Sequence, residues 1–412
     1  MWAMPEKTAA PQRARSSFRW VVMLGALAAI PAFTVDMYLP SLPEVAADLG
    51  STSSFAALSV SIMLVGGAAG QLVIGPLSDR FGRRRPLMIG LGMHVVISLL
   101  CALAPNMTVL VGLRLLQGFF NAACGVAAMA IVRDRFVGSE AARILSRLML
   151  IIGIAPLLAP TFGSAVAEVA SWRWVFGFLA LIGVTMGVIV WRFLPETHPV
   201  QRRATGGARS VAGGYAHLLR DRHFMALALL PGLGMAVLMS YVVTSPFVFQ
   251  EVYGLSHGQF SLLFALNGVG LVASAQLNAA LVRRVAPIRI LRTALVLQGF
   301  FAVVLLVVAV TGAGGLVGLL VALWCVLAFT GLVPANASAI ALSRHGERAG
   351  TAAAVIGAVQ SGVAGLVSPL AGALGGGAVA MTAVMLAAWT CAFLVLSLAT
   401  PAFRRGGWVQ LA

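Results

Sequence analysis

Twelve stretches of mostly apolar residues follow one another along this sequence, and they constrain the fold more than any other feature. A helix of about 20 apolar residues is long enough to cross the hydrocarbon core of a bilayer. The chain is 60% apolar and 10% charged, whereas soluble domains are about 45–50% apolar and about 25% charged. The sequence therefore predicts an all-α polytopic membrane protein with twelve transmembrane helices. The predicted spans are 20–39, 55–77, 86–104, 107–131, 146–167, 172–193, 224–249, 258–281, 288–310, 315–342, 350–372 and 377–400.

The positive charges mark one side of the membrane. Nearly all of the 28 Lys and Arg residues precede the first span, follow an even-numbered span or lie at the C-terminus. Arg173 is the exception among the connections, and Arg114 lies inside the fourth span. The positive-inside rule places both termini in the cytoplasm, with the spans in a bacterial-type inner (cell) membrane. The net charge of +16 is then a topology signal, and we expect no nucleic-acid partner.

The longest connection divides the chain into two halves. Residues 194–223 are polar and contain two Gly-Gly pairs, and six spans lie on each side. The predicted organisation is an N-terminal half over 1–193, a cytoplasmic linker over 194–223 and a C-terminal half over 224–412. Proteins with two such halves often bind their substrate between them at mid-membrane. We expect a monomer, because two halves already form a complete pathway.

Metal, cofactor and enzyme chemistry are not indicated. The four cysteines lie inside apolar stretches without CxxC spacing. Of the six histidines only His94 lies inside a span, and there is no HExxH motif. A lone histidine on an apolar helix is more often satisfied by packing than catalytic. We therefore predict no metal, no cofactor and no enzymatic activity.

Two ionisable residues lie within the spans, and such residues are costly in a membrane unless they have a function. Asp36 is the only acidic residue in the predicted spans, and Arg114 accompanies it. Helix rise places Asp36 about 6 Å and Arg114 about 10 Å below the outer surface. The two residues are therefore expected to pair directly, through a neighbour or through water. The alternatives are a static ion pair, or an aspartate that caps a helix end beside Pro40.

A polar stripe continues from Arg114 along the fourth span. Gln117 and Asn121 follow at i+3 and i+7 and share one helix face with Arg114. Lipid cannot satisfy these side chains, so the stripe should face a cavity or another helix. Binding and interhelical packing both remain open for it.

A charged turn follows the second span. Gly75, Asp79, Arg80, Gly82 and Arg83 stand in the pattern Gly-x-x-x-Asp-Arg-x-Gly-Arg-Arg. This pattern resembles the signature loop of the major facilitator superfamily. The resemblance implies that the loop latches the two halves in one conformation. The counterpart after the eighth span lacks both the glycine and the aspartate.

Two further segments resemble motifs of the same superfamily. Arg114-Leu-Leu-Gln117-Gly118 resembles its fourth-helix motif, whose arginine is implicated in proton coupling. The fifth span contains Pro156, Pro160 and Gly163, and it resembles the antiporter motif that distinguishes exporters from symporters. Proline and small residues let helices bend and approach closely.

A narrower resemblance rests on the ends of three spans. Val35-Asp36-Met37-Tyr38-Leu39-Pro40, Ser171-Trp172-Arg173 and Ser245-Pro246-Phe247 resemble the bicyclomycin/chloramphenicol-resistance subfamily of drug:proton antiporters. The resemblance implies a proton-coupled exporter of small amphiphilic drugs that works by alternating access, with protons and the lipid bilayer as its other partners. Asp36 matches the first-helix acid and Arg114 the fourth-helix arginine, which implies that both take part in proton coupling. A proton-coupled uptake carrier for a small metabolite is the alternative.

Candidate substrate contacts are polar or aromatic residues on the spans that should line the pathway. An apolar pocket with a few polar anchors suits amphiphilic drugs. For each residue, packing is at least as good an explanation as binding. The candidates are Tyr38, Gln117, Asn121, Tyr241, Phe249 and Asn267.

Overall fold

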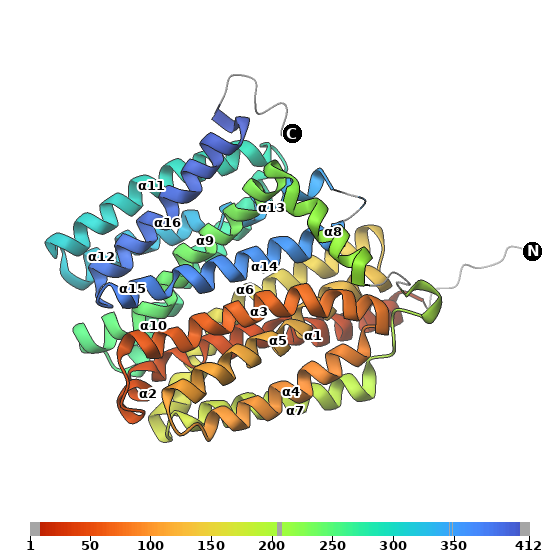
Figure 1. Ribbon diagram of the computed structural model, residues 1–412, viewed down its shortest axis with the longest axis horizontal. Coiled ribbons are helices and arrows are strands. Elements are labelled where there is room, and N and C mark those ends of the chain that lie inside the picture. Colours follow the sequence, from red (N-terminus) through yellow and green to blue (C-terminus); the bar gives the residue numbers. More distant parts are fainter. Residues whose placement is uncertain (1–8, 204–207, 346, 348, 404–412) are drawn as a thin grey trace, which may run out of the picture.

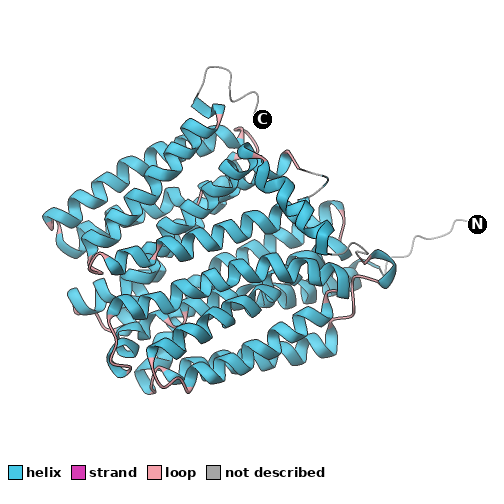
Figure 2. Ribbon diagram, in the orientation of Figure 1, coloured by secondary structure: helices cyan, strands magenta, loops and turns pink. Residues whose placement is uncertain are grey.

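The computed structural model describes residues 9–203, 208–345, 347 and 349–403, and this part of the chain is helical without strands (Figure 2). It contains twelve helical segments long and apolar enough to cross a membrane, which confirms the predicted fold class. The first part comprises α1 (Ala9–Asp36), α2 (Leu42–Asp48), α3 (Ser53–Phe81), α4 (Arg84–Ala102), α5 (Met107–Arg135), α6 (Gly138–Val169) and α7 (Arg173–Phe193). The second part comprises α9 (Arg222–Pro246), α10 (His257–Leu281), α11 (Pro287–Thr311), α12 (Gly315–Thr330), α13 (Val333–Ser343), α14 (Ala349–Val367), α15 (Pro369–Ala373) and α16 (Ala378–Ala399).

The segment between the two parts is partly helical. It contains the 3₁₀ turn η2 (Val200–Arg202) and the helix α8 (Ala208–Arg220). The hydroxyl of Tyr215 on α8 donates a hydrogen bond to the carbonyl of Leu72 on α3, at 2.9 Å. The helix therefore attaches to the first group of helices while it leads into the second. The predicted linker and terminal ranges include residues 1–8, 204–207 and 404–412, which lie outside the described residues.

Four spans consist of two helical pieces, and each has a proline at or near the break. The first span continues from α1 through η1 (Leu39–Ser41) into α2, and the seventh continues from α9 into the π-helical turn η3 (Phe247–Val252). Proline has no N–H for the helix ladder and clashes with the preceding turn, so Pro40 and Pro246 favour these irregularities. The α12–α13 and α14–α15 breaks likewise precede or begin at a proline.

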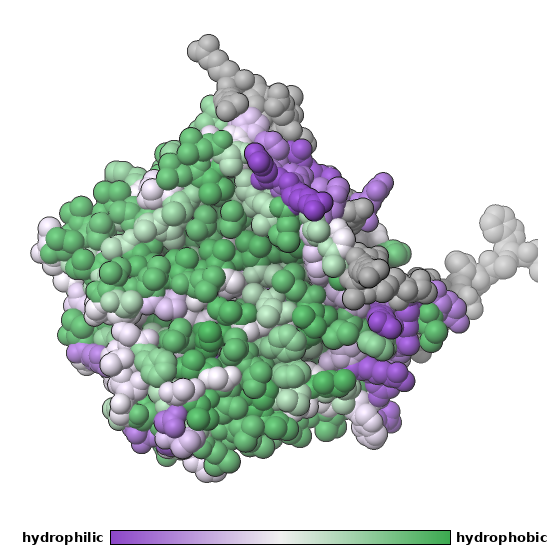
Figure 3. Space-filling model, in the orientation of Figure 1, coloured by the Kyte–Doolittle hydropathy of each residue, from purple (hydrophilic) through white to green (hydrophobic). Residues whose placement is uncertain are grey.

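The helices form two bundles, and the most extensive contacts between the bundles lie at two places. In Figure 1 α3, α4, α5 and α7 lie in the lower part of the view and α11, α12, α13 and α16 in the upper part, with α6, α10 and α14 between them. The two groups join where α3 packs against α14 and where α6 packs against α10. Apolar side chains cover the flank of the molecule, and hydrophilic residues gather at the helix ends, most densely beside α8 (Figure 3).

Close packing inside the first group depends on glycine. A Cβ on Gly118 of α5 would overlap the carbonyl oxygen of Met63 on α3. A Cβ on Gly66 of α3 would likewise overlap the carbonyl oxygen of Leu115. The hydrophobic effect does not drive helices together inside a bilayer. Small residues at the interface are what allows the backbones of two membrane helices to approach closely.

Candidate functional site

A cavity of about 660 Å³ lies between the two groups of helices. Its walls come from α1, α3, α5 and α6 on one side and from α9, α10, α12 and α14 on the other. It extends to the end of the molecule where Arg83 and the exposed Arg133 line it, which we call the arginine-rich end. The opposite end, where α1 breaks and α3 begins, is the closed end.

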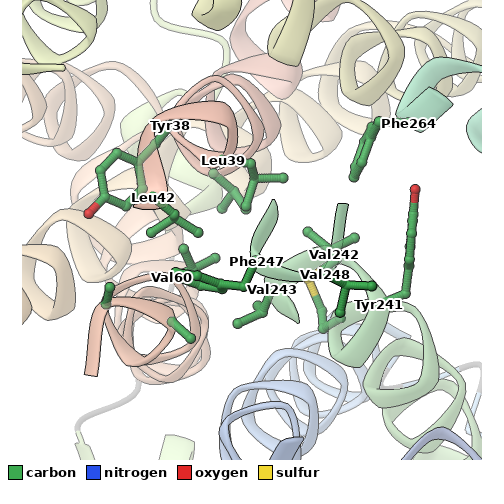
Figure 4. Packing of buried hydrophobic residues seen from close by; sticks show 14 of the residues in the cluster. Tyr38, Leu39, Leu42, Val60, Tyr241, Val242, Val243, Phe247, Val248 and Phe264 are labelled. Carbon is green, nitrogen blue, oxygen red and sulfur yellow. The ribbon is translucent and has the colours of Figure 1, made fainter. Parts of the chain in front are cut away.

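An apolar plug closes the cavity at the closed end (Figure 4). The first group contributes Tyr38, Leu39, Leu42 and Val60, all of them fully buried. The second group contributes the end of α9 and the start of η3. These residues are Val242, Val243, Phe247 and Val248.

Hydrogen bonds across the two groups surround this plug. The carbonyl oxygen of Pro40 accepts from Nε2 of Gln250 at 3.0 Å and lies 2.9 Å from Nδ1 of His257. A carbonyl only accepts, so His257 carries its proton on Nδ1 here. Ser164 bonds to Ser261 and to the carbonyl of His257, and Ser61 bonds to Ser368.

Asp36 ends α1 and lines the cavity beneath the plug. The residue is 5% exposed, and among the described residues its carboxylate forms no ion pair or hydrogen bond. Tyr241 of α9, in the second group, lines the same cavity. A carboxylate in such apolar surroundings carries a charge only at a cost, unless a cation or a proton meets it.

Arg114 lies behind the cavity wall and is completely buried. Its guanidinium donates to the carbonyl of Thr34 at 3.1 Å, to the carbonyl of Ser59 at 3.3 Å and to Oε1 of Gln117 at 2.7 Å. It also lies over the rings of Tyr38 and Phe176, with centroid distances of 5.0 and 5.7 Å. Among the described residues no hydrogen bond or ion pair joins Asp36 to Arg114, and Arg114 instead bonds to the carbonyl of Thr34, two residues before Asp36.

The six candidate substrate contacts divide into two sets. Asn121, Tyr241 and Asn267 line the cavity. Tyr38, Gln117 and Phe249 are buried elsewhere: Tyr38 is beneath Arg114, Gln117 bonds to Arg114 and to Ser98, and Phe249 packs against Phe260.

Polar residues of the cavity that were not among the predicted contacts lie on α3 and α14. Nε2 of Gln71 donates to Oγ of Ser361 across the cavity wall at 3.1 Å, and Gln360 lies beside this pair. The carboxamide of Gln71 occupies the space that a side chain on Gly357 would fill. Gln71 precedes Gly75 and Asp79 at steps of four, so the three share one helix face, and all line the cavity.

The charged turn after α3 is a tight cluster within the first group. Arg83 pairs with Asp79 and with Asp134, and Glu196 accepts from the backbone N–H groups of Arg83 and Arg84. Burial alone would lower the pKa of Arg83, but the hydrogen bonds and charges of the two aspartates raise it above its ordinary value. Burial would raise the pKa of Glu196, but hydrogen bonds from backbone N–H groups lower it.

The other residues of this turn have separate positions. Gly82 has a φ of 90°, a left-handed conformation that favours glycine. Arg80 lies over the ring of Phe81, 5.4 Å from the centroid, and Gly75 lines the cavity. None of the bonds found for Asp79 or Arg83 reaches the second group of helices.

The proline pair of α6 stands at the junction between the groups. Pro156 lines the cavity, and the carbonyl of Pro160 accepts a hydrogen bond from Ser261 of α10 at 3.0 Å. A Cβ on Gly163 would overlap the carbonyl oxygen of Met37. Gly163 therefore lets α6 touch the backbone of the first span next to Asp36.

Comparison with known proteins identifies the family. Residues 24–369 match the model of the Major Facilitator Superfamily. An uncharacterized MFS-type transporter, YdgK of Bacillus subtilis, is 36% identical over 88% of this chain and 90% of its own. The bicyclomycin resistance protein homolog of Haemophilus influenzae is 29% identical over 86% and 89%. The multidrug resistance protein MdtL of Escherichia coli O157:H7 is 31% identical over 62% and 65%.

Solved structures share the fold at low sequence identity. The crystal structure of a D-xylose-proton symporter superposes with a TM-score of 0.73 at 16% identity, and it covers 94% of this chain and 99% of that chain. A nucleoside transporter, NupG, gives 0.73 at 12% identity over 93% and 100%. Twelve apolar helices and bacterial relatives make this a multi-pass bacterial membrane carrier for a small molecule. The resemblance found in the sequence is confirmed, and the chain belongs to the major facilitator superfamily.

Proposed function

We propose that this protein is a proton-coupled antiporter that exports small amphiphilic drugs by alternating access. The observation that carries the proposal is the position of Asp36 on the wall of a largely apolar cavity between the two groups of helices, where its carboxylate has no hydrogen-bond or ion-pair partner among the described residues. The names of two relatives, a bicyclomycin resistance protein homolog and a multidrug resistance protein, support a drug as the substrate.

The sidedness follows from the positive-inside rule. The arginine-rich end faces the cytoplasm, both termini are cytoplasmic, and the closed end faces outward. The cavity then opens inward, with the plug and the bonds to Pro40 closing the outer side. In this conformation a drug enters from the cytoplasm or the inner leaflet, and the carrier works as a monomer.

Proton coupling uses the link between Asp36 and Arg114. An ionised Asp36 is costly in this apolar cavity unless it binds a drug, takes up a proton or moves toward Arg114. A drug and a proton therefore compete for Asp36. Arg114 is bonded to the α1 backbone at Thr34, so a change of charge on Asp36 acts on the same short stretch of α1. That stretch leads directly into the plug, which connects protonation to opening of the outer end.

The turn after α3 acts as the conformational latch. In the inward-open conformation Asp79 and Arg83 bond within the first half. We expect Asp79 to exchange this contact for one with the second half when the cytoplasmic side closes. The proline pair and Gly163 of α6 supply the flexible contact against which the halves move.

The test is transport in reconstituted vesicles with an imposed proton gradient. Wild type is compared with Asp36→Asn, with chloramphenicol as the first drug and Glu140→Gln as the control, since Glu140 is exposed in the first turn of α6. We expect gradient-dependent drug movement, lost in Asp36→Asn and kept in the control. Unchanged transport by Asp36→Asn would exclude Asp36 as the coupling residue. Co-movement of substrate and protons in one direction would instead favour the uptake carrier.

A further inference from the structure

His257 is the first residue of α10 and lies where the second half touches the first at the closed end. Its Nδ1 lies 2.9 Å from the carbonyl oxygen of Pro40, and its own carbonyl accepts a hydrogen bond from Oγ of Ser164 at 3.0 Å. Pro40 and Ser164 both belong to the first half. His257 is therefore part of the contact that separates when the closed end opens.

The ring of His257 can take up a proton without losing its bond to Pro40. Nδ1 already carries the hydrogen that meets the carbonyl, so Nε2 is the nitrogen that a further proton would occupy. The residue is partly exposed at the end of the molecule, which gives Nε2 access to protons from solution. The bond to Pro40 then comes from a charged donor, and such bonds are roughly twice as strong as neutral ones.

A carboxylate of the first half lies beside this position. Oε1 of Glu168, at the end of α6, is 3.2 Å from the place that a Cβ on Gly258 would occupy, and Gly258 directly follows His257. A positive charge on His257 is attracted by this carboxylate as well as by the carbonyl of Pro40. Both groups belong to the opposite half, so His257 loses both when the closed end opens.

The other charges around His257 do not distinguish the two conformations in this way. The turn η1 and the helix α12, which also pack against α10, have no charged residue. The positive end of the α10 dipole opposes a charge on His257, but it does so in both conformations alike. The remaining titratable residues at the closed end are Glu251 and Tyr253 of the second half and, in the first half, Glu44 and Asp48 of α2 and Arg173, which pairs with Asp48.

We propose that His257 is a second proton-binding site, and that a proton bound to its ring from the outside holds the closed end shut. A ligand shifts an equilibrium between two states by the difference in its affinity for them. The contacts of His257 with Pro40 and Glu168 supply that difference. The assignment of this end to the outside rests on the proposed sidedness, whereas the site itself depends neither on a drug nor on Asp36.

The size of the effect follows from the change in one hydrogen bond. Exchange of a neutral donor for a charged one corresponds to a shift of about 5- to 10-fold toward the closed end shut. Histidine changes its charge between about pH 5 and about pH 8, so acidification over this range should produce the shift.

Distance measurement between two spin labels in lipid nanodiscs tests the site. The labels replace Leu103 at the end of α4 and Val317 at the start of α12, which are exposed on opposite halves at the closed end, in a background with the native cysteines replaced. The background also contains Asp36→Asn, so that titration of Asp36 does not contribute. We expect the ratio of closed to open molecules to rise about 5- to 10-fold between about pH 8 and about pH 5.

Two histidine variants assign the effect. His257→Asn keeps a neutral N–H donor near the place of Nδ1 and cannot take up a proton, so the distances should no longer depend on pH. His223→Asn removes an exposed histidine at the arginine-rich end and should keep the full pH dependence. Glu168→Gln should reduce the shift, and it gives a second reading if His257→Asn fails to fold.

The same distance distribution at both pH values in the parent protein would overturn the proposal. A shift that persists in folded His257→Asn protein, or that Glu168→Gln leaves at full size, would overturn it as well. The measurement uses no drug and no proton gradient, so its failure is distinguishable from a failure of the proposed drug export.

Discussion

The carbonyl of Pro40 is the point at which the outer closure can be weakened most selectively. It accepts hydrogen bonds from two side chains of the second half, Gln250 and His257, at 3.0 and 2.9 Å. Replacing both donors, as Gln250→Leu with His257→Phe, removes these bonds and keeps apolar bulk in place. The change leaves Asp36, Arg114 and the cavity untouched.

The size of the effect follows from the number of bonds. An intramolecular hydrogen bond contributes about 0.5–1.5 kcal/mol net, so two contribute about 1–3 kcal/mol. That range corresponds to a shift of about 5- to 150-fold in the equilibrium between two states. In the outward-open state water reaches the Pro40 carbonyl, so the loss falls on the inward-open state, and the variant should populate outward-open molecules more.

Distance measurement between two spin labels reports this equilibrium. The labels are placed at Ala47 of α2 and Val252 of η3, which are exposed on opposite halves at the closed end, in a background with the native cysteines replaced. We expect a longer distance component that is weak in the wild type and substantial in the double variant.

A matched variant separates the loss of the two hydrogen bonds to Pro40 from general destabilisation of the protein. Gln259→Leu removes an amide from the first turn of α10 whose oxygen accepts from the backbone N–H of Ser256, so its side-chain hydrogen bond stays within the second half. It should leave the distance distribution as in the wild type. If the double variant also shows the wild-type distribution, the apolar plug alone holds the outer end closed and the reasoning from Pro40 is wrong.

Three further predictions concern the turn after α3 and the contact of α6. Gly82→Ala should cost about 1–3 kcal/mol because its φ of 90° and ψ of 166° lie in a region that almost only glycine adopts, and thermal unfolding in detergent measures the loss. Gly163→Val should cost about 1–3 kcal/mol in the free energy of unfolding by overpacking against Met37. Transport should fall further than the loss of folded protein, measured from the melting curve, explains. Glu196 has a lowered pKa, so its stabilising contribution is present above the ordinary Glu range and is lost as the pH falls through the lowered value. The difference in melting temperature between wild type and Glu196→Gln should therefore shrink on acidification, and a constant difference would contradict this.

Helix number was predictable because it follows from the length and spacing of the apolar stretches, and twelve such stretches predicted twelve spans. The partners of Arg114 were not predictable. Arg114 meets a backbone carbonyl of α1, and backbone groups leave no signal in the residue types.

The residues that line the cavity were harder to predict where the helices break. Tyr38 follows the end of α1, and Phe249 lies in the π-helical turn, so helical periodicity does not tell which way either side chain points. Gln71 lies within a regular helix, four residues before Gly75 and eight before Asp79, and that spacing was the available signal for its place on the cavity wall.

The bonds that cross between the halves differ in kind from those within them. The Arg–Asp ion pairs that we identify in the described part of the chain lie within the first half, as for Arg83 with Asp134. The two His–Asp contacts, His198 with Asp134 and His345 with Asp221, join one half to the segment between the halves. The polar contacts across the halves are neutral hydrogen bonds of Ser, Gln and His side chains. Such bonds are individually weak and are replaced by water when an end opens. The two conformations can therefore lie within a few kcal/mol of each other, and in that range the change of charge that we propose for Asp36 would shift the balance.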